Sequence, residues 1–377
     1  RKEKYSDASY FTEPDIKEGP GGLRDLHMMS WMARIYFKSD RLYRIRRFPV
    51  FSHFRLEQLG YSKWFLIKVR NRLHLMSERK EDRLLIPFQQ EISRDLGYKD
   101  GPLMTGPEKF MRDIYRHLNR IRYGRAEFLA KALDLIDPRP FESIADPLPP
   151  EFRVTKGNIV LAAEGRLKEN PLLILRGFEE ANRRGLFLGS GFIWEAGKIL
   201  SANGKGLLDQ PGSWEMFLRF ILKPVNPEIF RIALEIDLLT LFIPEFKRIR
   251  NLVQFGFYHM ATVDLHSLKT LEVLNRIGEG GYDDRWPLFK EIFKELQHPE
   301  WLFLAGLLHD IGKGYPGDHS VKGAALAPRI LKRLGVKEEA MDKVPLLIRD
   351  HLLLIHASQK RDLNDEKTSV QIAQIIK

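Results

Sequence analysis

The sequence has 377 residues, of which 44% are hydrophobic and 29% are charged, a composition typical of folded globular proteins. Its length suggests roughly two or three domains, and the absence of cysteine excludes disulfides, thiolate metal sites and cysteine nucleophiles. The longest apolar run, Trp301–Leu308, is far shorter than the ~20 residues that cross a bilayer. We therefore expect no membrane association, and a cysteine-free chain fits the reducing cytoplasm.

The net charge of +11 is unevenly distributed along the chain. The first 130 residues hold 27 basic and 17 acidic residues and so carry +10, whereas the rest of the chain carries +1. Such a basic segment attracts phosphates, nucleotides, acidic proteins or nucleic acid. A solvated helical face explains the same excess equally well, so both interpretations stay open.

Helical periodicity dominates the first third of the chain, where it predicts three helices: Leu23–Phe37, Lys63–Ser77 and Pro107–Leu133. In the third of these, arginines recur every four residues and share one face, at positions Arg112, Arg116 and Arg120. The proline-rich segment Asp137–Pro150 cannot continue a helix. We expect a domain boundary there.

Beyond this boundary the pattern alternates between helices and loops. Further helices are predicted over Asn170–Arg184, Pro227–Leu241, Thr262–Ile277, Trp301–Ile311, Ser320–Leu334, Val344–Ile355 and Glu366–Lys377. The glycine-rich, polar segment Ser201–Gly212 is interpreted as a loop, and Gly278 and Gly335 stand where helices commonly end. Strand signals are few and no repeat of 20–50 residues is present. The predicted fold class is all-α.

The strongest candidate for chemistry lies in the last third of the chain. His309 and Asp310 end an apolar helix and precede a Gly-Lys-Gly turn, so the helix delivers an imidazole and a carboxylate to the edge of a core. His266 lies upstream on another predicted helix, and His319 and His351 follow downstream. Imidazole nitrogens and carboxylate oxygens suit a divalent cation such as Mn, Fe, Zn or Mg. Histidines that hydrogen-bond to backbone carbonyls within a helical core are the alternative.

A second feature is the glycine-rich run Lys17–Asp25, which precedes the first predicted helix. Backbone N–H groups at such a point can bind phosphate, but the run lacks the spacing of known nucleotide-binding loops. A tight turn whose glycines let a helix pack closely is the preferred interpretation. The sequence also contains no Gly-x-Ser-x-Gly motif and no Asp-x-Asp pair.

Several blocks together resemble the GlnD family of bifunctional PII uridylyltransferase/uridylyl-removing enzymes. They cover nearly the whole chain in order: Glu13–Leu26, Glu81–Leu85, Phe110–Arg112 with Tyr115-Arg116, Ile243–Phe246, Tyr258-His259 with Thr262–His266, Leu308–Gly314, Gly317–Ser320, His351–Leu353, and Arg361-Asp362 with Asp365. In this family a catalytic palm transfers UMP from UTP to a tyrosine of the PII signalling protein, an HD-type domain removes the UMP, and ACT domains sense glutamine.

The resemblance implies three regions in this chain: the helical remainder of the transferase module at residues 1–140, a helical linker at 141–250, and a C-terminally truncated HD domain at 251–377. The palm motif and the ACT domains are missing from the sequence. We therefore expect a piece of a longer protein, a view that the lack of an initiator Met supports. The expected activity is metal-dependent removal of UMP from PII, without UMP transfer.

The resemblance also assigns residues to roles. The metal ligands it implies are His266, His309 and Asp310, binding Mn²⁺ or Mg²⁺, with a fourth aspartate expected beyond Lys377. Asp362 and Asp365 are nearer but less favoured candidates for that ligand, and Leu265 stands where the family often has glutamate. Three further residues are expected to act in catalysis, Lys313 on the phosphate and either His319 or His351 as a proton donor.

Two rival functions stay open. An HD hydrolase could act on another nucleotide phosphoester, which a substrate panel would reveal. Alternatively the basic first third could make the chain a binding module with a silent metal site, although no motif with interleaved aromatic residues supports nucleic-acid binding. The expected partners are therefore PII and its UMP or UTP, without membrane and without nucleic acid.

Overall fold

The computed structural model describes residues 13–38, 53–102, 104–136, 146–155, 157–163, 165–252 and 262–360, together with 368, 370 and 372–374. The chain divides into two compact units, the first made of residues 1–140 and 250–263 and the second of residues 141–249 and 264–377. Boundaries near residues 140 and 250 were also expected from the sequence, and the division into three domains stays a prediction.

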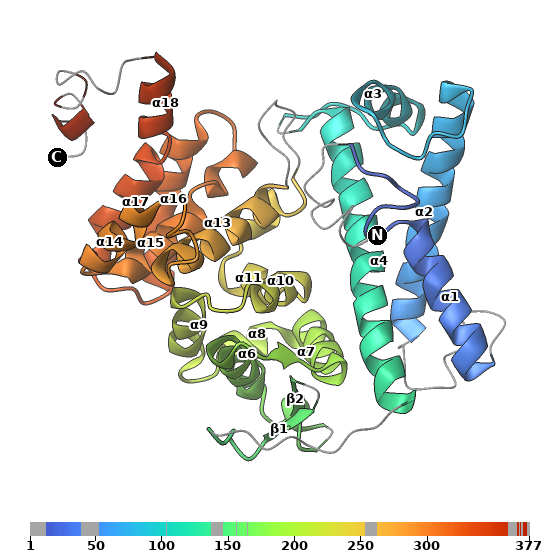
Figure 1. The fold of residues 1–377 in the computed structure, drawn as a ribbon, viewed down its shortest axis with the longest axis horizontal. Helices are drawn as coiled ribbons and strands as arrows, with labels where there is room; N and C mark the ends of the chain where they lie inside the picture. The colour runs from blue at the N-terminus through green and yellow to red at the C-terminus, as the bar shows by residue number, and fades with distance from the viewer. Residues whose placement is uncertain are drawn as a thin grey trace. The chain divides into compact units, whose positions relative to one another are not determined.

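The first unit is helical, and its helices are α1 (Leu23–Phe37), α2 (His53–Ser77), α3 (Ile86–Asp95) and α4 (Gly106–Ile136). The long helix α4 contacts each of the other three (Figure 1). Apolar residues at helical spacing, such as Leu66, Val69 and Leu73 on α2, are fully buried in the same core cluster as Phe110 and Ile114 of α4. Burial of these stripes stabilises the unit at about 25 cal/mol per Å² of apolar surface.

The glycine-rich run before α1 forms a tight turn against α4. Gly21 adopts a φ of +76°, and a Cβ at this position would lie 1.9 Å from the carbonyl oxygen of Leu118. Only glycine permits this approach of two backbones. The buried Asp25 carboxylate accepts a hydrogen bond from Gly21 N at 2.7 Å and lies 3.5 Å from the guanidinium of Arg125. The run is therefore a packing turn, which was the preferred interpretation.

The Asp82 carboxylate connects this turn to α2. It lies 2.6 Å from Arg70 Nε, 3.0 Å from His74 Nε2 and 3.4 Å from Lys17 Nζ. The Asp82 carbonyl also accepts a hydrogen bond from Ile16 N at 2.9 Å. Some basic residues of the first third, such as Lys17 and Arg70, thus form ion pairs within the unit, where they share the Asp82 carboxylate.

The second unit begins with a small sheet that the sequence analysis did not predict. It consists of β1 (Phe152–Thr155), β2 (Asn158–Leu161) and β3 (Phe187–Leu188) in the order β1-β2-β3. β1 and β2 are antiparallel, whereas β2 and β3 are parallel with Asn158 opposite Phe187. The turn between β1 and β2 contains Gly157 at a φ of +70°.

Eight short helices follow or surround this sheet: α5 (Arg166–Glu169), α6 (Leu172–Arg184), α7 (Ser190–Asn203), α8 (Lys205–Leu208), α9 (Ser213–Leu222), α10 (Pro227–Glu235), α11 (Leu238–Phe242) and α12 (Phe246–Ile249). Their core is aromatic, with Phe217 stacked on Phe242 at 4.1 Å and Phe220 on Phe230 at 4.5 Å between ring centroids. Such ring pairs add stability beyond their buried area.

The remaining helices of this unit are α13 (Val263–Gly278), α14 (Pro287–Glu295), α15 (Pro299–Leu308), the 3-10 helix η3 (Ile311–Gly314), α16 (His319–Arg333), α17 (Ala340–Asp350) and α18 (Leu353–Lys360). α17 contacts both α15 and α16, and η3 lies between α16 and α12. The Asp318 side chain caps α16 by accepting from Ser320 N at 2.8 Å, and Gly335 follows the helix at a φ of +71°.

The predicted all-α class is confirmed, with the small sheet as the exception. Several element predictions were wrong in detail. The helix predicted to begin at Lys63 begins at His53. Most of Ser201–Gly212 is helical rather than a loop, and the expected helix Pro227–Leu241 breaks at Asp237, whose φ is +67°. The expected helix Val344–Ile355 is divided between α17 and α18. The predicted helix Glu366–Lys377 falls mostly outside the described residues.

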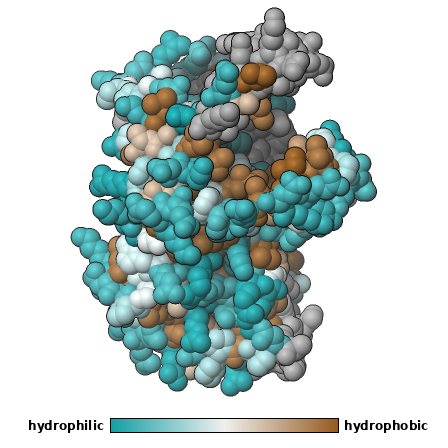
Figure 2. Space-filling view, turned by 90° about the vertical axis from the view of Figure 1, so that its left-hand side faces the viewer, coloured by the Kyte–Doolittle hydropathy of each residue, from teal (hydrophilic) through white to brown (hydrophobic). Residues whose placement is uncertain are grey.

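Among the described residues, no helix is long and apolar enough to cross a membrane. The face on which α14 and α18 lie is largely hydrophilic, with small hydrophobic groups between the polar side chains (Figure 2).

Candidate metal centre

His309 and Asp310 stand where α15 ends. The last six residues of α15, from Phe303 to Leu308, are buried. This burial fixes the C-terminal end of the helix in the core. The ring of His309 is fixed by a 2.9 Å contact between Nδ1 and the Gly306 carbonyl oxygen. Because a carbonyl only accepts, Nδ1 carries the proton, and Nε2 keeps its lone pair in the neutral ring. This is the arrangement of a metal-ligating histidine.

The Asp310 carboxylate is the centre of the cluster. Its side chain is only 2% exposed, and Oδ2 lies 2.8 Å from Lys313 Nζ and 3.4 Å from His309 Nε2. Burial alone would raise the pKa of Asp310, but the adjacent His309 ring and the Lys313 side chain hold the pKa well below its ordinary value. The carboxylate is therefore ionised at neutral pH.

His266 reaches this carboxylate from α13. Its Nε2 lies 3.8 Å from Asp310 Oδ2, and its ring centroid is 5.1 Å from that of His309. Gly306 permits the close approach of α13 and α15, because a Cβ on it would lie 2.9 Å from Leu274 Cδ1 and 3.3 Å from Thr270 Cγ2. The same glycine thus supplies a carbonyl to His309 and lets His266 approach it.

Two further histidines lie on the other side of the cluster, and one of them faces the other carboxylate oxygen. His319, the first residue of α16, places Nε2 3.6 Å from Asp310 Oδ1. His351 follows α17 and has its ring centroid 5.4 Å from that of His319 and 5.0 Å from that of His309. Its Nδ1 donates to the Ile348 carbonyl at 2.7 Å. In the neutral ring the lone pair of Nε2 therefore stays available for a ligand bond. Burial lowers the pKa of both His319 and His351.

Gly312 explains how η3 and α16 come so close together. A Cβ on Gly312 would lie 2.0 Å from the His319 carbonyl oxygen and 2.7 Å from Gly323 N. Both contacts are with backbone atoms, which cannot rotate away. The spacing between Asp310 and His319 therefore depends on the absence of a side chain at position 312.

The cluster fits a divalent cation by its donor set and its burial. His266, His309 and Asp310 offer ligand atoms that all lie within 4.8 Å of one another, and so do Asp310, His319 and His351. Asp310 Oδ2 is buried and receives no hydrogen bond of good geometry from the described residues, although Lys313 Nζ is close. A buried, unsatisfied carboxylate oxygen facing imidazole nitrogens is a suitable cation ligand.

Two other described histidines in the last third of the chain have different surroundings. His298 contacts Glu300 Oε1 through Nδ1 at 3.0 Å and stacks on Trp301 at 4.0 Å between ring centroids. His356 is exposed on α18. His259, Asp362 and Asp365 lie outside the described residues, so the fourth ligand stays a prediction. Sequence reasoning missed Gly306 and treated Gly312 only as part of the turn that follows His309 and Asp310, and the one available signal for their packing role was their position beside these two residues.

In comparisons with known proteins, two separate parts of the chain match two different families. Residues 1–129 match the family described as GlnD PII-uridylyltransferase, and residues 263–376 match the HD domain family. The histidines and the aspartate of the cluster all lie within the second match.

The chain is also similar over nearly its whole length to curated relatives called bifunctional uridylyltransferase/uridylyl-removing enzyme. The relative from Rhodospirillum rubrum is 32% identical over 99% of this chain, that from Ruegeria pomeroyi 32% over 97%, and that from Cereibacter sphaeroides 32% over 100%. The chain spans about two fifths of the length of these relatives, from 40% to 41%.

Proposed function

Because this chain belongs to the GlnD family and contains an HD domain at residues 263–376, we propose that its HD region is a metal-dependent phosphodiesterase that removes UMP from the PII signalling protein. The single observation that supports the proposal most is the buried Asp310 carboxylate, which faces His266 and His309 on one oxygen and His319 on the other. The names of the relatives support the choice of reaction.

In this proposal His266, His309 and Asp310 hold a divalent cation, and His351 adds a further imidazole. The cation would supply an activated water and positive charge for the phosphoryl oxygens. Of the two ions expected from the sequence, Mg²⁺ prefers oxygen ligands and retains several waters. A group this rich in histidine therefore fits Mn²⁺ better.

Lys313 and His319 are the residues that we assign to the substrate. The Lys313 side chain is 6% exposed and its Nζ lies 2.8 Å from Asp310 Oδ2, so in this proposal it provides a cation for the phosphate oxygens. His319 is the better proton donor, because His351 already donates its Nδ1 proton to Ile348 O. The leaving group is a tyrosine phenolate with an ordinary pKa near 10, which needs modest assistance.

The proposal also names a substrate protein and a cellular location. We propose PII carrying UMP on a tyrosine as the substrate and the cytoplasm as the location. UMP transfer from UTP is not expected from these 377 residues, because the sequence contains no Asp-x-Asp pair. The cationic side chains Lys17 and Arg70 pair with Asp82, which argues against a nucleic-acid surface at that point.

Release of UMP from uridylylated PII tests the proposal. We expect His309→Ala to lower the Mn²⁺-dependent rate at least a hundredfold, since loss of a ligand removes the activated water. His356→Ala is the matched control, because His356 is exposed on α18, and it should keep the wild-type rate. Equal rates for His309→Ala and the wild type would refute the proposal. A panel of other nucleotide phosphoesters identifies an HD hydrolase with a different substrate.

A further inference from the structure

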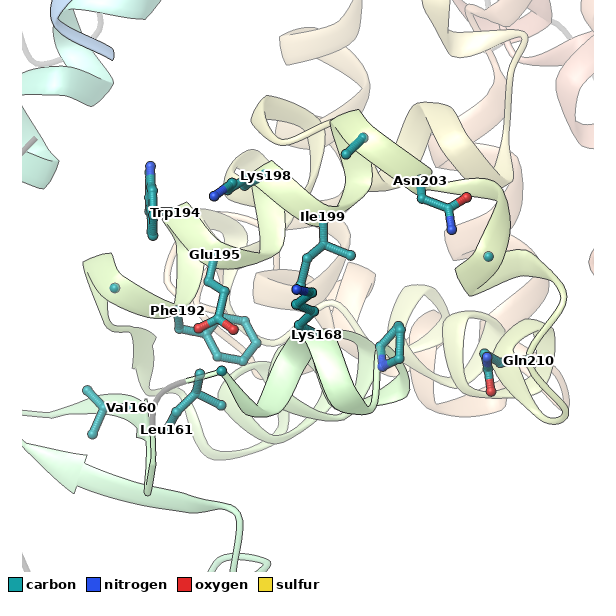
Figure 3. Close-up of a pocket in the computed structure, with 15 residues that line it drawn as sticks. Val160, Leu161, Lys168, Phe192, Trp194, Glu195, Lys198, Ile199, Asn203 and Gln210 are labelled. Atoms are coloured by element: carbon teal, nitrogen blue, oxygen red, sulfur yellow. The ribbon is translucent and has the colours of Figure 1, made fainter. Parts of the chain in front are cut away.

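The second unit contains a cavity of about 850 Å³ that lies between α7 and the segment formed by β2 and α5 (Figure 3). Small-molecule sites in proteins measure about 300–1,000 Å³. The lining residues fall between Val160 and Gln210, in a part of the chain that neither family match covers. The cavity is therefore large enough for a ligand and has no role in the proposed phosphodiesterase.

The cavity exists because α7 presents two different faces. Phe192, Ala196 and Leu200 turn toward the core, and Phe192 lies 6.2 Å from Phe178 between ring centroids. The adjacent face, with Gly191 and Ile199, lines the cavity. A Cβ on Gly191, or on Gly165 across the cavity, would meet no atom within 4 Å. Small residues at these positions thus leave the space open.

The lining combines an apolar body with a few polar groups. Val160, Leu161 and Ile199 provide apolar surface, and Figure 3 shows Lys168 between the end with Phe192 and the end with Asn203 and Gln210. Apolar walls with a small number of placed polar groups are typical of ligand pockets.

The charges indicate what kind of ligand fits. Lys168 is exposed and forms no ion pair with any residue in the described ranges, so its ammonium is available to a ligand. Lys198 adds a second cation and lies 5.4 Å from the ring centroid of Trp194. Figure 3 shows the Glu195 carboxylate at the Phe192 end, away from the amides of Asn203 and Gln210. An anionic head therefore belongs beside Lys168 and an apolar, uncharged part at the Phe192 end.

We propose that this cavity binds an organic anion with an apolar or aromatic body and a phosphate, sulfonate or carboxylate head. The body lies on Leu161 and Ile199, the head pairs with Lys168, and the amides of Asn203 and Gln210 hydrogen-bond to polar atoms beyond the head. Binding at this cavity is independent of the metal centre, so a failure of the phosphodiesterase proposal would leave it intact.

The test uses 8-anilinonaphthalene-1-sulfonate, an aromatic sulfonate whose fluorescence rises in apolar surroundings, titrated into the purified chain. Ala202→Trp fills the cavity from an exposed position on α7, and Lys168→Glu reverses the charge at the head position. We expect each variant to weaken dye binding at least tenfold. Lys168→Glu removes one charge-assisted contact, which accounts for a loss of this size, and Ala202→Trp occupies the space that the dye needs. Lys205→Glu makes the same charge change on α8 outside the lining and should leave binding unchanged. Circular dichroism and thermal melts verify that the variants fold.

Competition then identifies the body of the ligand. Displacement of the dye by millimolar UMP indicates a nucleoside body, and displacement by octanoate indicates an aliphatic one. Either result supports the proposal. Dye binding that is the same in Ala202→Trp and the wild type would overturn it, as would binding insensitive to Lys168→Glu or a dye that neither competitor displaces.

Discussion

Substitution of Gly312 by alanine tests how the cluster around Asp310 is built. The added Cβ would lie 2.0 Å from the His319 carbonyl oxygen, against the 3.4 Å or more of ordinary contacts, so the start of α16 must retreat by about 1.4 Å. Overpacking of this kind costs typically 1–3 kcal/mol. Because both clashing partners are backbone atoms, we expect a loss near the upper limit, about 3 kcal/mol in the free energy of unfolding.

The same displacement reaches the cluster, because His319 is the first residue of α16 and lies 3.6 Å from Asp310 Oδ1. We expect Mn²⁺ to bind at least tenfold more weakly, measured by calorimetry, and urea unfolding to report the loss of stability. Gly335→Ala is the matched control: its φ is +71° but its Cβ would meet no atom within 4 Å. It should cost about 1 kcal/mol and leave Mn²⁺ binding unchanged. Surface substitutions usually change the free energy of unfolding by no more than about 0.5 kcal/mol. If Gly312→Ala changes it by no more than that, the close packing of η3 against α16 is refuted.

Three further predictions concern single side chains. Asp82→Asn leaves Arg70 and its neighbouring cations without their carboxylate, so we expect urea unfolding to show a loss of about 2 kcal/mol. Burial lowers the pKa of His117 to about 4, so the folded protein resists protonation: stability is full above pH 6.5 and falls by roughly 2 kcal/mol as the pH drops to 4.5. His117→Gln should remove that part of the pH dependence, and an unchanged slope would contradict the assignment. Lys313→Met removes the cation nearest Asp310, so the metal-free protein should lose about 2 kcal/mol, whereas added Mn²⁺ should raise its Tm more than that of the wild type. An equal Mn²⁺ effect on both proteins would contradict the position of Lys313.

Helices with a regular apolar stripe were predictable from the sequence. The bounds of α1, Leu23–Phe37, match the expected segment, and α16 differs from its prediction by one residue at each end. The break between α10 and α11 was not predictable, because it depends on a left-handed conformation at Asp237, and this conformation is uncommon for non-glycine residues even though aspartate adopts it more often than most. The hairpin of β1 and β2 had a signal that was missed, namely Gly157 between two short alternating segments.

The candidate cluster was predictable as a set of residues but not as a geometry. The order of His266, His309 and Asp310 along the chain, together with the family resemblance, pointed to their convergence. The roles of Gly306 and Gly312 depend on which helices approach each other, and that is decided by tertiary packing rather than by local pattern. The cavity along α7 was equally hidden, since the segment after it was interpreted as a loop.

Anomalous X-ray scattering from crystals soaked in Mn²⁺ tests the central claim most directly. A peak at bonding distance from His309 Nε2, from an Asp310 carboxylate oxygen and from His266 is the predicted result, with Lys313 displaced from the carboxylate. Ordered crystals that bind Mn²⁺ elsewhere, or that show no peak beside Asp310 at saturating Mn²⁺, would contradict the account.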